Sequence, residues 1–285
     1  MTQASPADAR AGTGDLERKQ SALYRTLGEL PSLVVAYSGG VDSAYLAYAA
    51  TRVLGDQALC VTADSPSYPE RHRQMAVRLA REFGFQHEII RTDEMSRPEY
   101  RANPANRCYF CKQELYTHLT SIARERGVPV VADGSNADDR GDYRPGRQAA
   151  REFGVLSPLD AADLTKDDIR ELSRRAGLPT WDEPASACLS SRIPYFSDVT
   201  DAKLRMIEAA EAVLRDLGFR ICRVRHHDTI ARLELGRDEI ARALEPEMAD
   251  AIDRALRALG YAHVTVDLRG YRLGSLNEAL KLRRV

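Results

Sequence analysis

The stretch Ser38-Gly39-Gly40-Val41-Asp42-Ser43 decides the fold of the first half of this chain. An apolar run at residues 33–37, typical of a buried strand, precedes it, and residues 44–54 follow with the spacing of an amphipathic helix. A Gly-rich turn between a strand and a helix presents backbone N–H groups and a helix N-terminus to an anion. The stretch therefore predicts a site for nucleotide phosphates, with simple chain reversal as the alternative.

Each polar or small residue of this turn has an expected role. Gly39 and Gly40 let the backbone approach an anion closely, and Ser38 and Ser43 add hydroxyl donors. Asp42 would repel a bare phosphate, so it indicates a metal-chelated polyphosphate or a structural role in the turn. We expect all five residues at the phosphate site, with Asp42 close to Mg²⁺.

Strand and helix patterns alternate along the first 160 residues of the chain. This alternation predicts an α/β fold with a parallel sheet, in which ligands bind beyond the carboxyl ends of the strands. Polar segments follow two further strands at Ala63-Asp64 and at residues 133–139, so we expect one shared site. The predicted strands are residues 33–37, 58–63, 88–91 and 128–132, and the predicted helices are residues 43–54, 69–83 and 112–126.

The segment after the fourth predicted strand reads Asp133-Gly134-Ser135-Asn136-Ala137-Asp138-Asp139. Carboxylates beside a polyphosphate favour Mg²⁺, which prefers oxygen ligands. We expect Gly134 and Asn136 near the phosphates, together with Ala63 and Asp64, and Asp138 beside Asp42 at the metal. The alternative is an ordinary acidic loop that caps the next helix.

The remainder of the chain indicates a second, smaller domain. A capping-box pattern predicts a helix over residues 165–176, and residues 178–194 form a long segment with little periodicity. Beyond it, a helix at 200–217, strands at 220–225 and 230–235, a helix at 245–259 and a strand at 262–268 predict an α+β domain. We expect a flexible tail over residues 1–14, a large domain over 15–198 and a small domain over 199–285.

Three cysteines stand in distinctive surroundings. Cys188 lies in the aperiodic segment close to Arg192, which would stabilise a thiolate or bind a phosphate. Cys108 and Cys111 form a C-x-x-C motif at the start of a predicted helix. With Cys188 they make three thiolates, the number that would leave one iron of a [4Fe–4S] cluster open. A redox pair and two unremarkable thiols are the alternatives.

Arginines and histidines mark the predicted strand at residues 220–225. Arg223 and Arg225 share one face of that strand, because side chains alternate with a period of two. Two guanidinium groups on one face suit a carboxylate or a phosphate, and an exposed charged face is the alternative. His226, His227 and Asp228 are more typical of a turn than of a metal site.

Composition restricts the partners and the location. The chain has 285 residues and a formal net charge of −1, which disfavours a large nucleic-acid footprint. No apolar run approaches the roughly 18 residues of a membrane helix, and residues 1–14 lack the apolar core of a signal peptide. We therefore expect a cytoplasmic protein with a small-molecule substrate.

The hexapeptide at Ser38 resembles the pyrophosphate-binding loop, S-G-G-x-D-S, of the PP-loop ATP pyrophosphatase superfamily, whose members are adenine nucleotide alpha hydrolase-like enzymes that adenylate a second substrate. The phosphate loop G-x-x-x-x-G-K-[ST] is absent from the sequence. Together, S-G-G-V-D-S, N-R-C-Y-F-C-K, D-G-S-N-A-D-D, D-Y-R-P-G-R and P-A-S-A-C-L-S-S-R-I-P-Y closely resemble motifs of the LarE family, in the same order.

The resemblance implies an ATP-dependent sulfur transferase in the biosynthesis of the nickel-pincer nucleotide cofactor of lactate racemase, often a homo-oligomer. The implied substrate is pyridinium-3,5-biscarboxylic acid mononucleotide, whose carboxylates are adenylated before sulfur replaces oxygen. Cys188 would be the sacrificed nucleophile in one version of the mechanism and a cluster ligand in the other. The residues implied to bind the substrate are Ser191, Arg192, Glu211, Arg223 and Arg225, the last two at its phosphate.

Other adenylating enzymes with the same loop are the main alternatives. A tRNA thiolase should have a basic face or an added RNA-binding domain, and the charge balance indicates neither. An amide-forming ligase usually needs an ammonia source. An AMP-binding sensor module would have no use for three clustered thiols.

Overall fold

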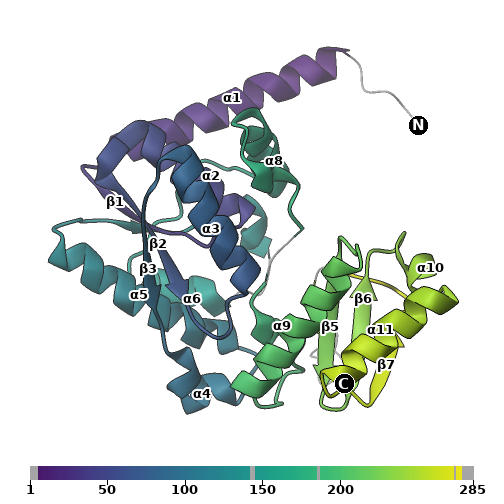
Figure 1. Ribbon diagram of the computed structural model, residues 1–285. Helices are drawn as coiled ribbons and strands as arrows, with labels where there is room; N and C mark the ends of the chain where they lie inside the picture. Colours follow the sequence, from purple (N-terminus) through teal and green to yellow (C-terminus); the bar gives the residue numbers. More distant parts are fainter. Residues whose placement is uncertain (1–5, 142–144, 185–186, 273, 278–285) are drawn as a thin grey trace. The chain divides into compact units, whose positions relative to one another are not determined.

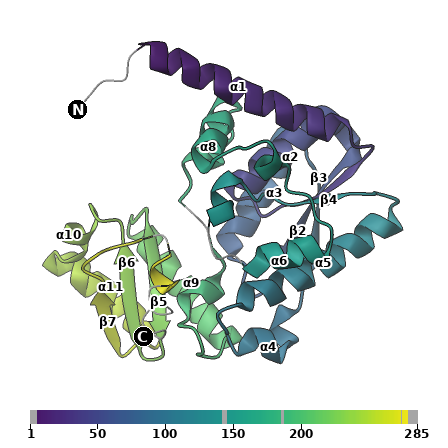
Figure 2. The same cartoon turned by 180° about the vertical axis from the view of Figure 1, so that it is seen from behind.

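The computed structural model describes residues 6–141, 145–184, 187–272 and 274–277 (Figures 1 and 2). Its helices, 3-10 helices (η) and strands follow one another as α1 (Pro6–Gly28), β1 (Leu33–Ala36), α2 (Val41–Leu54), η1 (Gly55–Gln57), β2 (Ala58–Asp64), α3 (Glu70–Phe83), β3 (Gln86–Arg91), η2 (Glu94–Ser96), α4 (Pro98–Arg101), α5 (Arg107–Glu125), β4 (Val131–Ala132), η3 (Ala137–Gly141), α6 (Pro145–Glu152), α7 (Pro158–Ala161), α8 (Lys166–Arg175), η4 (Pro179–Asp182), η5 (Leu189–Arg192), α9 (Asp201–Asp216), β5 (Cys222–His227), β6 (Ile230–Leu235), α10 (Ile240–Ala243), α11 (Pro246–Ala258), β7 (His263–Val266) and η6 (Ser275–Asn277).

The chain divides into two compact units. Unit 1 comprises Met1–Asp64, Glu70–Thr92 and Cys108–Glu183, and unit 2 comprises Ser65–Pro69, Asp93–Arg107 and Pro184–Val285. Two short segments of the first hundred residues therefore belong to the same unit as the C-terminal part. The domain boundary near residue 198 stays a prediction of the sequence.

The described strands of unit 1 form a parallel sheet in the order β3-β2-β1-β4, which confirms the predicted α/β class (Figures 1 and 2). Successive residues of a strand point to opposite faces of the sheet. Leu33 and Val35 accordingly pack with α1, α2 and α8, whereas Val34 and Ala36 pack with α5 and α6. β1 is buried on both faces, which explains its unbroken apolar run.

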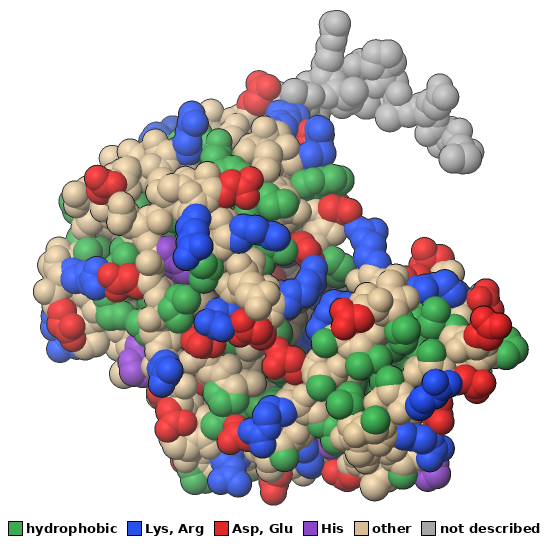
Figure 3. Space-filling view, in the orientation of Figure 1, with side chains coloured by type: hydrophobic (Ala, Val, Ile, Leu, Met, Phe, Trp, Pro, Cys, Tyr) green, Lys and Arg blue, Asp and Glu red, His purple; other side chains and the backbone are tan. Residues whose placement is uncertain are grey.

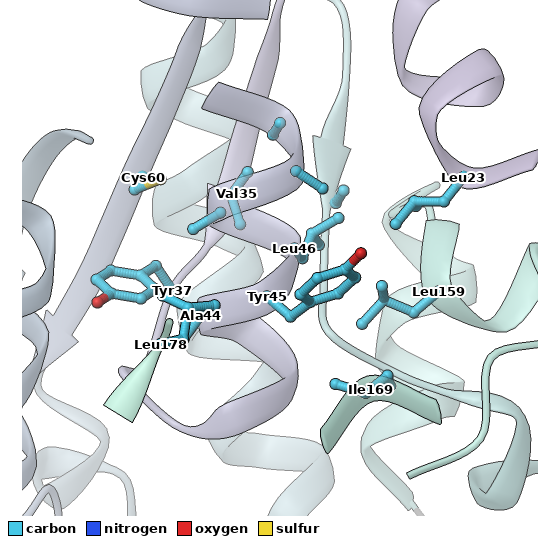
Figure 4. Packing of buried hydrophobic residues seen from close by; sticks show 14 of the residues in the cluster. Leu23, Val35, Tyr37, Ala44, Tyr45, Leu46, Cys60, Leu159, Ile169 and Leu178 are labelled. Carbon is cyan, nitrogen blue, oxygen red and sulfur yellow. The ribbon is translucent and has the colours of Figure 1, made fainter. Parts of the chain in front are cut away.

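The larger core of unit 1 is built around α2 (Figure 4). Tyr45 and Leu46 are fully buried there, and Leu23 of α1 packs against the same core. The Tyr45 hydroxyl is not left unpaired, because Gln20 Nε2 lies 3.0 Å from it. Burial raises the pKa of Tyr45, so the phenol remains neutral. α1 thus contributes both apolar and polar contacts to the domain that carries the phosphate loop.

The flexible tail expected over residues 1–14 stays a prediction of the sequence, although part of this stretch is helical. Residues 1–5 lie outside the described residues, and α1 begins at Pro6. Proline suits the first position of a helix, where its missing N–H costs nothing, and the alanines that follow have the highest helix propensity. Because this stretch has no apolar stripe, hydrophobic periodicity did not predict a helix here.

The described strands of unit 2 form a sheet in the order β5-β6-β7, with β5 and β6 antiparallel and β6 and β7 parallel. Its core places Val224 and Leu233, paired in register, beneath α9 and α11. Figure 3 shows hydrophobic side chains gathered over these two helices, where Met206 and Met248 are only partly buried. The predicted order α-β-β-α-β is confirmed, with the short α10 added.

Most expected elements lie within a few residues of the observed ones, and the differences have local causes. Thr165 accepts the Asp168 N–H while the Asp168 side chain accepts the Thr165 N–H, so the predicted capping box starts α8. α5 begins at Arg107, earlier than expected, and carries the C-x-x-C motif in its first turns. In the described residues no helix has both the length and the apolar character needed to span a membrane.

If α1 belongs to the core, Leu23→Ala will lower the free energy of unfolding by about 2–5 kcal/mol, because it leaves a cavity beside α2. Urea unfolding followed by circular dichroism measures the change. Leu268→Ala is the control, since its side chain is 83% exposed and the change should stay within about 0.5 kcal/mol. Equal stability of the Leu23→Ala variant and the wild type would contradict the docking of α1.

Candidate functional site

The phosphate loop of unit 1 is closed by its own hydroxyl groups. Ser43 Oγ donates to the Gly40 carbonyl at 3.1 Å, accepts the Ser38 N–H at 3.1 Å and lies 3.0 Å from Ser38 Oγ. Since the Ser43 proton is used on Gly40, Ser38 is the donor between the two hydroxyls. Ser38 is exposed and Ser43 is buried, so the loop has a fixed inner side and an accessible outer side.

Gly39 and the start of α2 give this loop its opening toward an anion. Gly39 has φ +66°, and a Cβ atom there would lie 3.0–3.1 Å from Ala76, so only glycine fits without strain. Within the described residues, no side chain caps the N-terminus of α2 at Gly40. The first N–H groups of the helix therefore remain available for an anion.

The turn after β4 packs directly on the beginning of α2. A Cβ atom at Gly134 would lie 2.9 Å from the Ser43 nitrogen, so this close approach requires glycine. Asn136 is buried, and its Oδ1 accepts the Asp138 N–H at 3.1 Å. Since β1 lies between β2 and β4 in a parallel sheet, Ala63 and Asp64 at the end of β2 reach the same edge.

Asp133, the residue that follows β4, is buried and accepts four hydrogen bonds. It accepts the Tyr116 hydroxyl at 2.7 Å, the Ser157 hydroxyl at 2.8 Å, and the N–H and hydroxyl of Ser135 at 3.1 and 3.0 Å. Lys112 lies over the Tyr116 ring at 5.3 Å from its centroid. Burial lowers the Lys112 pKa, but the Tyr116 and Asp133 oxygens outweigh it and raise the pKa overall. Asp133 thereby secures the turn that carries Gly134.

Asp42 and Asp138, the two expected metal-proximal residues, both contact Lys166. Lys166 Nζ pairs with Asp42 Oδ2, and the Lys166 N–H donates to Asp138 Oδ2 at 2.8 Å. Asp42 Oδ1 is buried and has no hydrogen-bond partner among the described residues. A buried carboxylate oxygen in that state suits a hard cation such as Mg²⁺. The sequence did not predict a role for Lys166 at this site, because there it only followed the capping residue Thr165.

In unit 2, the backbone of the turn that carries Cys188 is held by side-chain donors. Arg192 Nη1 donates to the carbonyls of Ala187 and Cys188 at 2.7 and 3.0 Å, and the Ser191 hydroxyl donates to Cys188 O at 2.7 Å. The Cys188 side chain itself is half-buried. The turn therefore combines a fixed backbone with an accessible thiol.

The expected substrate residues Arg192 and Glu211 form a buried ion pair. Arg192 Nε and Nη2 lie 2.8 and 3.1 Å from the two Glu211 oxygens, and the side chains are only 2% and 4% exposed. Burial alone would raise the Glu211 pKa, but the Arg192 guanidinium outweighs it and holds the pKa below its ordinary range. The pair connects the Cys188 turn to α9.

Arg225 and Arg223 lie on the face of β5 opposite the α9–α11 core. Arg225 donates to Ser191 O at 2.8 Å, Glu234 Oε2 at 2.7 Å and Ser275 Oγ at 2.8 Å. Its Nε is buried and has no hydrogen-bond partner within the described chain. The Arg223 guanidinium lies over the Tyr271 ring, 5.2 Å from its centroid. Both of these arginines are held by protein contacts before any substrate is considered.

Cys108 and Cys111 lie three residues apart in the first turns of α5, and hence on one side of the helix. Cys108 is exposed and Cys111 is half-buried. They belong to unit 1, whereas Cys188 belongs to unit 2. Within the part of the chain that the structure describes, no three Cys, His, Asp or Glu side chains are placed together to hold a metal ion. Cys60 and Cys222 are buried core thiols.

Several known proteins resemble this chain, two of them along nearly its whole length. Residues 25–116 match the family model of NAD synthase. An uncharacterized protein of Synechocystis is 43% identical over 93% of this chain and 99% of its own length. The pyridinium-3,5-bisthiocarboxylic acid mononucleotide synthase of Lactiplantibacillus plantarum is 37% identical over 93% of this chain and 96% of its own. A glutamine-hydrolyzing GMP synthase of Staphylococcus saprophyticus is 26% identical over 65% of this chain and 39% of its own.

The lowered pKa of Glu211 predicts a pH-dependent stability difference. A carboxyl with a depressed folded-state pKa stabilises the fold above its unfolded pKa, about 4.3, and loses that contribution as the pH falls through the folded pKa. Glu211→Gln should therefore cost about 3–5 kcal/mol at pH 7, because Arg192 stays buried without its partner charge. The gap to wild type should narrow below about pH 4.5.

Urea unfolding of both proteins between pH 7 and pH 3 measures this gap. Glu247→Gln, in an exposed position of α11, is the control and should follow the wild type at every pH. A gap of constant size over the whole range would contradict the linkage to Glu211.

Proposed function

Because this chain belongs to the LarE family of ATP-dependent sulfur transferases, we propose that it acts on pyridinium-3,5-biscarboxylic acid mononucleotide. It adenylates the carboxylates of this nucleotide and replaces an oxygen of each with sulfur. The product is pyridinium-3,5-bisthiocarboxylic acid mononucleotide, on the route to the nickel-pincer nucleotide cofactor of lactate racemase. The observation that carries this proposal is the closed phosphate loop at Ser38–Ser43 in a chain that also holds a thiol on a fixed turn.

Adenylation comes first, because a carboxylate resists attack by a thiolate. A substrate carboxylate oxygen attacks the α-phosphorus of ATP, and pyrophosphate leaves with the electron pair of the broken P–O bond. Ser38, Gly39, Gly40 and Ser43 would hold the departing phosphates through hydroxyl and backbone N–H groups. Ala63, Asp64, Gly134 and Asn136 line the same sheet edge and complete the proposed nucleotide site.

Mg²⁺ would bind at Asp42 and Asp138, where the unpaired buried oxygen of Asp42 supports the assignment. When bound, it neutralises charge on the phosphates. Lys166 pairs with the other oxygen of Asp42, Oδ2, and is a nearby source of positive charge for the leaving pyrophosphate. In this proposal Asp42 thus has two positive partners, one on each carboxylate oxygen.

Sulfur transfer follows on the acyl adenylate. The Cys188 thiolate attacks the acyl carbon, and AMP leaves with the electron pair of the acyl–oxygen bond. In the sacrificial version, a base removes the Cys188 Cα proton, the Cβ–S bond breaks and the thiocarboxylate leaves, so that dehydroalanine remains. Ser191, Arg192, Glu211, Arg223 and Arg225 are the proposed substrate-binding residues, although their present contacts hold the turn and β5.

The C-x-x-C motif supports a second source of sulfur. Cys108 and Cys111, one helical turn apart, with Cys188 would hold a [4Fe–4S] cluster and leave one iron open to carry a sulfide for transfer. Cys188 would then be a ligand and keep its sulfur. We further propose that the enzyme is cytoplasmic and homo-oligomeric and that its partner is a small nucleotide.

Gly134→Ala should weaken ATP binding by at least about tenfold, because the added methyl group would lie 2.9 Å from the Ser43 nitrogen and push the two turns apart. Isothermal titration with ATP and Mg²⁺ measures the affinity. Gly28→Ala is the matched control, since its new methyl group would meet only Val53 at 3.7 Å. Unchanged ATP affinity in the Gly134→Ala protein would argue against this site.

Cys188→Ala should abolish formation of the thiolated product and leave substrate-dependent pyrophosphate release intact, because adenylation precedes the use of the thiol. Coupled pyrophosphate detection and mass spectrometry of the nucleotide measure the two steps. Cys222→Ala is the control, because burial raises the pKa of this core thiol to about 11 and keeps it out of the chemistry. Normal turnover by Cys188→Ala would contradict its role.

Iron content and protein mass decide between the two sources of sulfur. Anaerobic purification should give brown protein with about four iron atoms per chain if the cluster is present. Each of Cys108→Ala, Cys111→Ala and Cys188→Ala should then lose iron. Active, colourless protein that loses the mass of one H₂S at Cys188 after turnover would instead establish sacrifice and rule out the cluster.

An amide-forming ligase is the second candidate, because glutamine-hydrolyzing GMP synthases share 24–26% identity with this chain over 65–70% of its length. Acyl adenylates react with ammonia as well as with sulfur nucleophiles, so ammonium or glutamine should be offered as the acceptor. A tRNA thiolase has less support, since acidic and basic side chains are interspersed on the face drawn in Figure 3.

A further inference from the structure

The turn that carries Cys188 is held by a segment much earlier in the sequence. Tyr100, Asn103 and Arg107 belong to unit 2 with that turn, and all three are buried. The Tyr100 hydroxyl shares a hydrogen bond of 2.7 Å with the Ser190 hydroxyl. Asn103 and Arg107 likewise bind Ser190 or residues close to it. None of the three side chains is among the expected substrate residues.

Asn103 binds three carbonyl groups of the chain that follows the turn. Its Nδ2 donates to Pro194 O at 2.7 Å, to Ser197 O at 3.0 Å and to Ile193 O at 3.3 Å. Its own carbonyl accepts the Phe196 N–H at 2.9 Å. Asn103 has φ +51°, a left-handed conformation that asparagine tolerates better than most residues. The residue type therefore fits both the backbone and the side-chain contacts.

Arg107 fixes the orientation of Asn103 and binds the turn itself. Its Nη1 donates to Asn103 Oδ1 and, at 3.0 Å, to Ser190 O. Because the guanidinium can only donate, the Asn103 oxygen must face Arg107 and its NH₂ group must face the three carbonyls. The side chain of Arg107 is almost completely buried. The Arg107 guanidinium thus orients the Asn103 side chain and binds the carbonyl of Ser190, which is two residues from Cys188 in the sequence.

We propose that Asn103 and Arg107 are positioning residues for the sulfur-transfer step; this inference rests on the proposed function. They hold the backbone of residues 190–197 so that the half-exposed Cys188 side chain has one approach to the acyl adenylate. A displacement of about 1 Å from attack geometry costs roughly a hundredfold in rate. The residues proposed to bind ATP lie in unit 1, so the loss of this scaffold should spare adenylation when the substrate is saturating.

The same segment leads directly into the C-x-x-C motif. Arg107 is the first residue of α5, and Cys108 follows it. The residue that binds the carbonyl of Ser190 is therefore bonded covalently to the first cysteine of the motif. Positioning by Arg107 applies in the same way to a sacrificed Cys188 and to a Cys188 that holds a cluster.

Arg107→Met and Asn103→Asp test the proposal. Arg107→Met removes every donor of the guanidinium while roughly keeping the length of the side chain. Asn103→Asp replaces the NH₂ donor with an oxygen, which cannot bind the three carbonyls, and retains the oxygen that faces Arg107. Both should lower the single-turnover rate of thiolated product formation by at least about tenfold. Pyrophosphate release should stay within about twofold of wild type, and Arg107→Lys should recover part of the lost rate. Arg101→Met, at an exposed position in the same segment, is the matched control.

Alkylation of Cys188 by iodoacetamide in iron-free protein gives a measurement that does not depend on activity. A loosened turn should react faster in Arg107→Met and Asn103→Asp than in wild type and in Arg101→Met. Folded variants with wild-type alkylation and wild-type product formation would overturn the proposal, as would equal losses in both catalytic steps. If the wild type itself releases no pyrophosphate, the proposed function fails, and the alkylation rates still decide the positioning role.

Discussion

The close approach of Gly134 to the first turn of α2 is the constraint on which the candidate phosphate site depends. A side chain at this position would collide with the Ser43 nitrogen, so the ends of β1 and β4 meet without space for even a methyl group. The hydroxyl of Ser43 is meanwhile occupied in closing its own loop. Backbone groups held in place by packing and by the loop's own hydrogen bonds therefore face an anion with little need to reorganise.

In unit 2, by contrast, buried charged side chains form hydrogen bonds with the backbone of the turn that carries Cys188. Arg107, Arg192 and Arg225 are all buried, and each donates to a carbonyl of residues 187–191. Glu211 and Glu234 pair with Arg192 and Arg225. Such buried pairs add little net stability, but breaking one leaves a charge without compensation. Each of these arginines therefore connects the backbone of the thiol-bearing turn to its surroundings.

Local patterns made the strand–turn–helix at Ser38 and the capping box at Thr165 predictable from the sequence, because each rests on residues within a few positions of one another. Contacts between distant residues leave no such periodic trace. Lys166 reaches Asp42 across 124 positions, and Arg107 reaches Ser190 across 83. The beginning of α1 was not predicted for a related reason, since its alanine-rich start has no apolar stripe. The sequence supplied candidates for the site residues, but it did not predict what each candidate contacts.

A series of polar contacts connects the N-terminal helix α1 to the candidate phosphate loop. Lys19 of α1 bonds Asp168 at 2.8 Å, Asp168 completes the cap of α8, and Lys166 at the start of α8 holds Asp42. A deletion or fusion at the amino terminus is therefore not a neutral choice when this protein is expressed or compared with homologues of different length. Altered nucleotide affinity in such a protein would then result from the loss of these contacts and not from a change in the candidate phosphate loop itself.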